Sequence, residues 1–283
     1  MTTMNLILQG PGATMTTLER IAALANPHTI SALGEHAVRC EGVDFCATLK
    51  QTIELAAGAA QLDATFIEAG ISLADFKLVA MDMDSTLITI ECIDEIADMQ
   101  GLKAQVAEIT EAAMRGELEF CESLKRRVAL LEGLDGAALE RVYTERLAIS
   151  LGGEAMLAAL KAAGLKTLLV SGGFTFFTER LQQRLGLDYT HANMLEIIDG
   201  KLTGRVTGAI VDALEKKRTV ERVCAELGIS ARQAIVMGDG ANDLQMMSVA
   251  GLSVAFRAKP VVRVQASVAL NFSGLDGLLT ILA

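Results

Sequence analysis

The sequence predicts an α/β protein built on a parallel sheet, because three apolar runs end in small, hydroxyl or acidic residues and each precedes a helix-like stretch. The runs cover residues 76–81, 165–170 and 234–237. Strands that alternate with helices form a parallel sheet with right-handed crossovers, so the three carboxyl ends should meet at one edge. Ligands of open parallel sheets bind beyond such ends, and a site is expected there.

Residues 1–74 differ from the rest and should form a small α+β module. Residues 5–10 fit a strand, the spacing of Leu18, Ile21 and Leu24 fits a short amphipathic helix, and residues 47–62 fit an alanine-rich helix. Nothing in this segment indicates chemistry. Regulation, formation of a homodimer and simple packing all stay open as its use.

The remaining chain, residues 75–283, should be the domain that carries the chemistry. Between its first two apolar runs lie residues 88–150, far more than the dozen or so that a crossover helix needs. Phe120, Leu124, Val128 and Leu131 follow a helical period within that insert. We therefore expect a small helical cap, inserted after the first strand, that excludes water from the acidic edge and selects the substrate.

Composition excludes several classes of protein. At 283 residues, with 51% hydrophobic and 21% charged residues, the chain should be globular with about two domains. A net charge of -10 without a basic stretch argues against a nucleic-acid partner. No apolar run approaches the ~20 residues of a membrane span, and the N-terminus does not resemble a secretory signal. We expect a soluble cytoplasmic protein with no membrane partner, whose scattered cysteines are reduced packing residues.

The first and third apolar runs lead into acids. Asp82 and Asp84 follow the first run, and Asp239 and Asp243 follow the third. Carboxylates gathered in this way repel one another unless a cation compensates, and carboxylate oxygens without histidine or cysteine favour Mg²⁺. The metal would let a carboxylate approach a phosphate dianion. Asp82 is the candidate nucleophile, and Asp84 is the candidate general acid and base.

A phosphoryl group also needs hydrogen-bond donors and a positive charge. Ser171, Gly172 and Gly173, after the second run, can supply the donors. The apolar stripe of the helix after residue 212 projects back onto both Lys216 and Lys217, and periodicity does not distinguish them.

Arg127 falls on the inward stripe of the predicted cap, whereas Arg126 projects about 100° away. An inward arginine can bind a substrate carboxylate bidentately, and it can equally extend its charged end to solvent. Each motif has such an ordinary reading: a capped turn at residues 82–86, an Asx-rich loop at 238–243, and a solvated helix face around Glu91. Their joint occurrence in this order, each of the strand-end motifs after an apolar run, favours a catalytic site.

Residues 76–283 resemble the haloacid dehalogenase superfamily of phosphotransferases, and within it the phosphoserine phosphatases. The resemblance implies a Rossmann-like core in which Asp82 is phosphorylated, Asp84 is the acid and base, and residues 171–173 bind phosphate. It aligns the family lysine with Lys216. It also implies that Asp239 ligates Mg²⁺ beside the Asp82 carboxylate and the Asp84 carbonyl, while Asn242 and Asp243 hold that cluster and contact phosphate or metal-bound water.

Two segments of the predicted cap are similar to family segments that contact the substrate, and they indicate the class of substrate. Residues 91–97 are similar to a family segment whose first glutamate, here Glu91, faces the substrate amine. Residues 120–128 are similar to a segment whose last arginine, here Arg127, binds the substrate carboxylate, with Met114 and Phe120 as apolar walls. The resemblance implies Mg²⁺-dependent hydrolysis of phosphoserine to serine and phosphate through an aspartyl-phosphate, the last step of serine biosynthesis.

Two alternatives stay open. One is a phosphatase or phosphotransferase for another small metabolite, such as phosphothreonine, since one methyl group changes selectivity only modestly. The other is an inactive protein that binds an effector, because residues 1–74 loosely resemble the ACT-like regulatory modules of some relatives.

Overall fold

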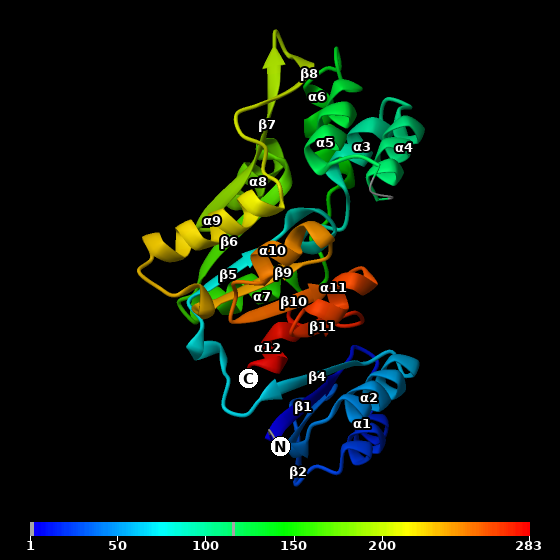
Figure 1. Cartoon of the computed structure of the whole chain (residues 1–283), viewed down its shortest axis with the longest axis vertical. Helices are drawn as coiled ribbons and strands as arrows, with labels where there is room; N and C mark the ends of the chain where they lie inside the picture. The colour runs from blue at the N-terminus through cyan, green and yellow to red at the C-terminus, as the bar shows by residue number, and fades with distance from the viewer. Residues whose placement is uncertain (1–2, 115–116) are drawn as a thin grey trace.

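The computed structural model describes residues 3–114 and 117–283, with the side chains of Thr3 and Met114 outside that description. It contains a large and a small sheet, with a group of helices beside one end of the large sheet (Figure 1). In the described part of the chain, no helix combines the length and the apolar character needed to cross a bilayer.

The large sheet has the strand order β11-β10-β9-β5-β6-β7-β8. Its strands are β5 (Leu78–Met81), β6 (Lys166–Phe174), β7 (Tyr189–Ile198), β8 (Lys201–Thr207), β9 (Ala234–Gly238), β10 (Leu252–Phe256) and β11 (Val268–Leu270). The pairs from β11 to β7 are parallel, which confirms the predicted class. The antiparallel hairpin of β7 and β8 was not predicted.

Strand β5 lies between β9 and β6 and is buried on both faces. Val79 and Met81 belong to one hydrophobic core, whereas Leu78 and Ala80 belong to the core on the opposite face. Alternate side chains point to opposite faces of a strand, so a strand between two cores must be apolar at every position. This explains the continuous apolar run, and it places Asp82 at the carboxyl end of a central strand.

Helices surround this sheet. They are α7 (Gly153–Ala162), α8 (Thr175–Leu185), α9 (Ala213–Glu226), α10 (Leu244–Met247), α11 (Pro260–Gln265) and α12 (Gly277–Ile281). Short turns η2 (Leu73–Asp75), η3 (Met83–Leu87), η5 (Ala231–Gln233) and η6 (Ala241–Asp243) connect the elements. The Asp212 side chain caps α9 by accepting a hydrogen bond from the Glu215 N–H at 2.8 Å, which fixes where that helix begins.

The segment between β5 and β6 is helical, as the sequence indicates. It contains α3 (Cys92–Asp98), α4 (Lys103–Met114), α5 (Phe120–Ala129), α6 (Ala137–Arg141) and η4 (Val142–Arg146). The predicted stripe of α5 is buried at Leu124 and Val128. The Gly133 and Gly136 N–H groups donate to carbonyl groups of Leu202 and Gly200, so the β7–β8 hairpin supports these helices (Figure 1).

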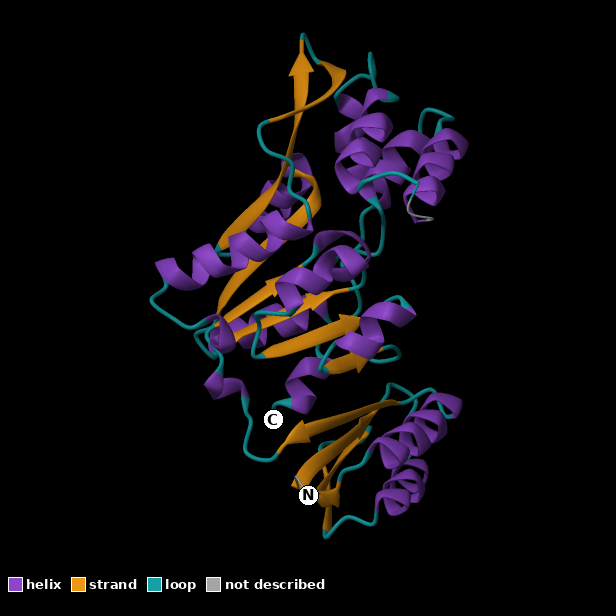
Figure 2. Ribbon diagram, viewed as in Figure 1, coloured by secondary structure: helices purple, strands orange, loops and turns teal. Residues whose placement is uncertain are grey.

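The N-terminal segment is α+β, with antiparallel pairing and the strand order β2-β3-β1-β4. Its elements are β1 (Thr3–Gln9), α1 (Met15–Ala22), η1 (Ala23–Ala25), β2 (Thr29–Ala32), β3 (Ala37–Asp44), α2 (Ala47–Ala59) and β4 (Asp63–Glu68). Helices α1 and α2 cover one face of this sheet (Figure 2). The Asp63 carboxylate accepts hydrogen bonds from the N–H groups of Asn271, Phe272 and Ser273, which attaches the segment to the large sheet.

Candidate active site

The chain leaves β5 through a tight turn that carries the first two predicted acids. Asp82 is only 5% exposed, and its Oδ1 accepts a hydrogen bond from the Met83 N–H at 2.7 Å. Ser85 has a φ of 55°, which is uncommon for a residue with a Cβ, and its N–H donates to the Ile90 carbonyl. The turn presents the side chains of Asp82 and Asp84 to one cavity.

Lys216 is the lysine that reaches this turn. Its Nζ lies 2.8 Å from Asp82 Oδ1 and 2.8 Å from Asp243 Oδ1, and its side chain is 1% exposed. Burial alone would lower the pKa of Lys216, but the carboxylates of Asp243 and Asp82 raise it above its ordinary value. Lys217 is instead partly exposed, with its Nζ 3.9 Å from Glu221. The choice that periodicity left open is resolved in favour of Lys216.

Three carboxylates gather around this lysine. One oxygen from each of Asp82, Asp239 and Asp243 lies within 4.8 Å of the others. Burial, reinforced by Asp243, raises the pKa of Asp82 above its usual range and that of Asp239 to about 6. One ammonium balances only part of this charge, and a donor set made of oxygens suits a hard divalent cation. The acidic cluster therefore fits a metal site.

Asp84 occupies a different environment beside the helical insert. Its Oδ1 accepts a hydrogen bond from the Cys92 N–H, at the start of α3, at 3.1 Å. Burial, followed by the nearby charge of Glu91, raises the pKa of Asp84 to about 7. A carboxyl group that titrates near neutral pH can both donate and accept a proton, as a general acid and base must. Glu91 is itself held by the Ser85 hydroxyl, which donates to its Oε1 at 2.7 Å.

Ser171, Gly172 and Gly173 lie in the last part of β6, which runs on to Phe174 before α8 begins. A Cβ at Gly173 would lie 2.7 Å from Asp84 Oδ2, and one at Gly172 would lie 3.0 Å from the Phe120 ring. A side chain at either position would displace Asp84 or Phe120, so glycine lets this backbone approach both the acidic turn and the helical insert.

Asn193 is a supporting residue that sequence reasoning missed. Its Nδ2 donates to the Gly172 carbonyl at 2.7 Å, and its Oδ1 accepts from the Val211 N–H at 2.8 Å. The side chain is buried and joins β6 to the segment before α9. A lone asparagine gave no sequence signal, because both of its partners are backbone groups of distant segments.

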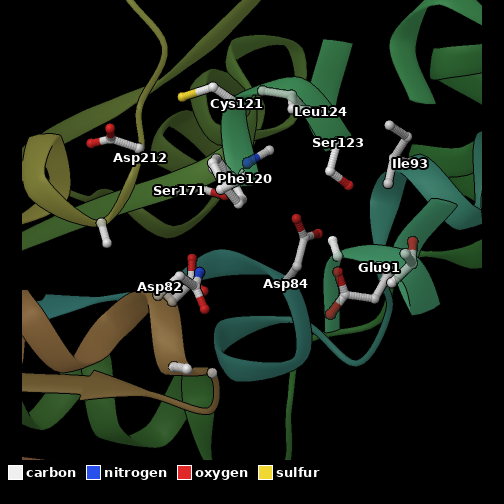
Figure 3. Close-up of a pocket in the computed structure, with 18 of the residues that line it drawn as sticks. Asp82, Asp84, Glu91, Ile93, Phe120, Cys121, Ser123, Leu124, Ser171 and Asp212 are labelled. Carbon is white, nitrogen blue, oxygen red and sulfur yellow. Dashed lines mark hydrogen bonds between the residues drawn. The ribbon is translucent and has the colours of Figure 1, made fainter. Parts of the chain in front are cut away.

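A cavity of about 810 Å³ connects these elements, and its walls come from the large sheet and from α3, α4 and α5 (Figure 3). The predicted residues that line it are Asp82, Asp84, Glu91, Phe120, Arg127, Ser171, Gly172, Gly173, Asp239 and Asn242. Lys216 and Asp243 are buried behind Asp82, outside the lining. The Met114 side chain, a predicted apolar wall, lies outside the described residues.

The cavity also has lining residues that the sequence did not single out, among them Ile93, Ser123 and Lys259. The Lys259 N–H donates to the Asp239 carbonyl at 3.1 Å, just before α11. The sequence could have indicated Lys259, because it follows the apolar strand β10, whose carboxyl end lies at the same edge of the sheet as those of β5, β6 and β9.

Arg127 faces the cavity and Arg126 faces solvent, as the helical period predicts. The Arg126 Nε bonds Glu122 at 2.7 Å on the exposed side of α5. Arg127 is partly buried, and burial lowers its pKa even though Asp94, Glu91 and Asp84 act in the opposite direction. An arginine remains charged under such conditions, so the wall formed by α5 is electropositive at this point.

A parallel sheet with acids at its carboxyl ends, beneath an inserted group of helices, defines a hydrolase of the α/β class with an acidic site. The family model of haloacid dehalogenase-like hydrolases matches residues 76–251, and the chain belongs to this family.

Individual relatives agree with this assignment. A phosphoserine phosphatase from Polaromonas sp. is 59% identical over 214 residues, which cover 74% of this chain and 91% of that protein. A HAD family hydrolase from Salmonella enterica superposes with a TM-score of 0.89 at 33% identity, over 99% of this chain and 98% of that one. A probable phosphoserine phosphatase from Vibrio cholerae gives a TM-score of 0.84 at 38% identity, over 98% and 86%. The last two similarities include the N-terminal segment.

Proposed function

We propose that the protein is a Mg²⁺-dependent phosphatase that hydrolyses O-phosphoserine to serine and phosphate, as the last step of serine biosynthesis. The observation that carries the proposal is one cavity lined by the acids Asp82 and Asp84, by Glu91, and by Arg127. A phosphorylated amino acid presents a phosphate, an ammonium and a carboxylate, and this cavity offers a partner for each. The named function of the Polaromonas relative supports the same substrate.

In the proposed reaction, Asp82 attacks phosphorus while the bond from phosphorus to the serine oxygen breaks. Asp84 donates its proton to that leaving oxygen. Water then attacks the aspartyl-phosphate, Asp84 removes a proton from it, and phosphate and a free Asp82 carboxylate result. Lys216 keeps the nucleophile oriented through its 2.8 Å contact, and Ser171 and the adjacent backbone donate to the phosphoryl oxygens.

Mg²⁺ would be held by Asp82, Asp239 and the Asp84 carbonyl, with Asn242 and Asp243 holding the acidic cluster. When bound, the ion supplies positive charge that lets an anionic carboxylate approach an anionic phosphate. The clustering of three carboxylate oxygens within 4.8 Å supports this assignment.

For recognition, we assign Glu91 to the substrate ammonium, Arg127 to its carboxylate, and Phe120 and Met114 to the apolar walls. Residues 88–150 would act as the cap of a catalytic domain spanning residues 75–283. Residues 1–74 would be a separate ACT-like regulatory module, which is also the candidate contact of a homodimer. We place the protein in the cytoplasm, where a small phosphorylated metabolite is its substrate.

The test is phosphate release by the purified protein from O-phosphoserine, with Mg²⁺ and with excess chelator. Activity should require the metal and should disappear in Asp82→Asn. Asp199→Asn is the matched control, because Asp199 is exposed in the β7–β8 turn. Undiminished turnover in chelator would reject the metal, and turnover by Asp82→Asn would reject the nucleophile.

A panel with phosphothreonine and other phosphomonoesters separates the substrate assignment from the reaction type. The proposed substrate should have the highest kcat/KM. A higher value for a compound without an amino group would reject the roles given to the cap residues while leaving the phosphatase chemistry intact.

A further inference from the structure

Ser123 is a polar residue in the cavity wall whose hydroxyl has no hydrogen-bond partner among the described residues. The residue is 1% exposed, and its Oγ is among the buried polar atoms left unpaired in the described part of the chain. A buried hydroxyl without a partner loses its bonds to water and gains nothing in return. Such a group in a cavity wall indicates a bond that forms only when a ligand is present.

The position of Ser123 defines which ligand group it can reach. It lies on α5 one helical turn before Arg127, and both residues line the cavity. Figure 3 shows its side chain directed into the pocket, on the same side as Asp84, Glu91 and Ile93. A helical serine often bonds the carbonyl four residues earlier, but here the Glu119 carbonyl accepts only the Ser123 N–H, at 2.9 Å.

Arg127 leaves room for a second donor to an anion at this site. Its Nε already donates to the Ser123 carbonyl at 3.4 Å, which leaves the terminal nitrogens for a ligand. A carboxylate offers about four acceptor positions, and a bidentate guanidinium fills two of them. The neighbouring hydroxyl is correctly placed on the helix to supply a further donor to an anion bound there.

We propose that the Ser123 hydroxyl binds the carboxylate of the substrate beside the Arg127 guanidinium, and so contributes to selection of an α-amino acid phosphate. The inference rests on the proposed function, because it assumes a substrate with a carboxylate. It assigns Ser123 to substrate binding, whereas the chemical steps are assigned to Asp82 and Asp84 on the turn after β5.

The test is Ser123→Ala in the full-length protein, assayed by steady-state kinetics on O-phosphoserine and O-phosphoethanolamine, which lacks the carboxylate. Alanine is smaller and favours helix, so the variant should fold. KM for O-phosphoserine should rise about tenfold, equivalent to about 1.4 kcal/mol, with kcat within about twofold of wild type. The kcat/KM for O-phosphoethanolamine should not change, and the melting temperature of the free protein should not fall.

Ser273→Ala is the matched control, because Ser273 also has a buried, unpaired hydroxyl but does not line the cavity. It should leave both substrates unaffected. An unchanged KM for O-phosphoserine in an active Ser123→Ala protein would overturn the inference, as would an equal loss for both substrates. Wild-type activity alone tests the proposed function: if the wild-type protein does not hydrolyse O-phosphoserine, the proposed function is wrong, and the role of Ser123 falls with it.

Discussion

Replacing Lys216 by methionine is the most informative single change in the buried site. The variant keeps the length and apolar stem of the side chain but removes the ammonium that lies 2.8 Å from both Asp82 and Asp243. Both carboxylates remain buried, Asp82 in the cavity wall and Asp243 behind it, without the cation that lies between them. The change therefore tests whether the charge network, and not packing around the stem, holds the nucleophile.

The expected cost follows from the contact distances. At an effective dielectric constant of about 20, each 2.8 Å contact is worth about 6 kcal/mol of attraction. Desolvation of the three ions cancels most of this gain in the intact protein. Deleting the lysine removes the attraction but leaves the carboxylates desolvated, and breaking a buried pair in this way costs about 3–5 kcal/mol. For 283 residues, a loss of 4 kcal/mol corresponds to about 7 °C in melting temperature.

The assay is thermal and urea unfolding in chelator, together with turnover in Mg²⁺. Lys216→Met should lose about 4 kcal/mol of unfolding free energy and at least about a hundredfold in kcat. Lys217→Met is the control, because this partly exposed neighbour makes only a 3.9 Å ion pair with Glu221 and should change stability by less than about 0.5 kcal/mol. Adding Asp243→Asn should destabilise the wild type but stabilise Lys216→Met. A Lys216→Met protein as stable as wild type in chelator would refute the reasoning.

Three further changes test other contacts. Ser85→Ala removes the donor that orients Glu91 at 2.7 Å; it should raise KM for O-phosphoserine by up to about tenfold, with no change for a substrate without an ammonium group. Burial alone would raise the pKa of Asp188, but hydrogen bonds from Lys166 and Thr167 hold this pKa below its ordinary value of 3.8. That stabilisation is present above pH 3.8 and is lost as the pH falls through the lowered pKa of Asp188. Urea unfolding should therefore show Asp188→Asn less stable than wild type at pH 7, by at most about 1 kcal/mol because the ion pair is largely exposed, with a difference that shrinks as the pH falls below 3.8. Asp63→Ala leaves backbone N–H groups after β11 without their acceptor; it should cost about 3 kcal/mol and speed amide exchange there, while equal exchange would contradict this anchoring role.

The strand-end motifs could be predicted because burial on two faces leaves a strand little choice of residues. Val79 and Leu78 face opposite cores, so polar groups can appear only once the strand has ended. The same constraint applies to β9 before Asp239. Parallel strands with right-handed crossovers have their carboxyl ends at one edge of the sheet, which the sequence predicts, whereas the order β9-β5-β6 that makes these ends neighbours is seen in the structure.

Other parts depended on partners far away in the chain. Lys216 and Lys217 are about equally consistent with one apolar stripe, and the choice is made by Asp243, which lies 27 residues further along. The β7–β8 hairpin has apolar residues at exposed positions, with Met194 54% and Ile198 53% exposed, so its sequence does not alternate clearly between apolar and polar residues. Ser123 could not be singled out, because the sequence shows neither the burial of its side chain nor the lack of a hydrogen-bond partner for its hydroxyl.

The contacts between the two sides of the cavity link substrate selection to proton transfer. The acid Asp84 is held by the Cys92 N–H at the start of α3, so part of its position is set by the helical insert and not by the sheet. Glu91, the residue before Cys92, is in turn held by Ser85 from the acidic turn. A displacement of α3 would therefore move the assigned ammonium partner and the assigned proton donor together. Glu91 and Asp84 both depend on the position of α3. A substrate that fits Glu91 poorly should therefore bind weakly and also lose its phosphoryl group slowly, so that kcat should fall as KM rises.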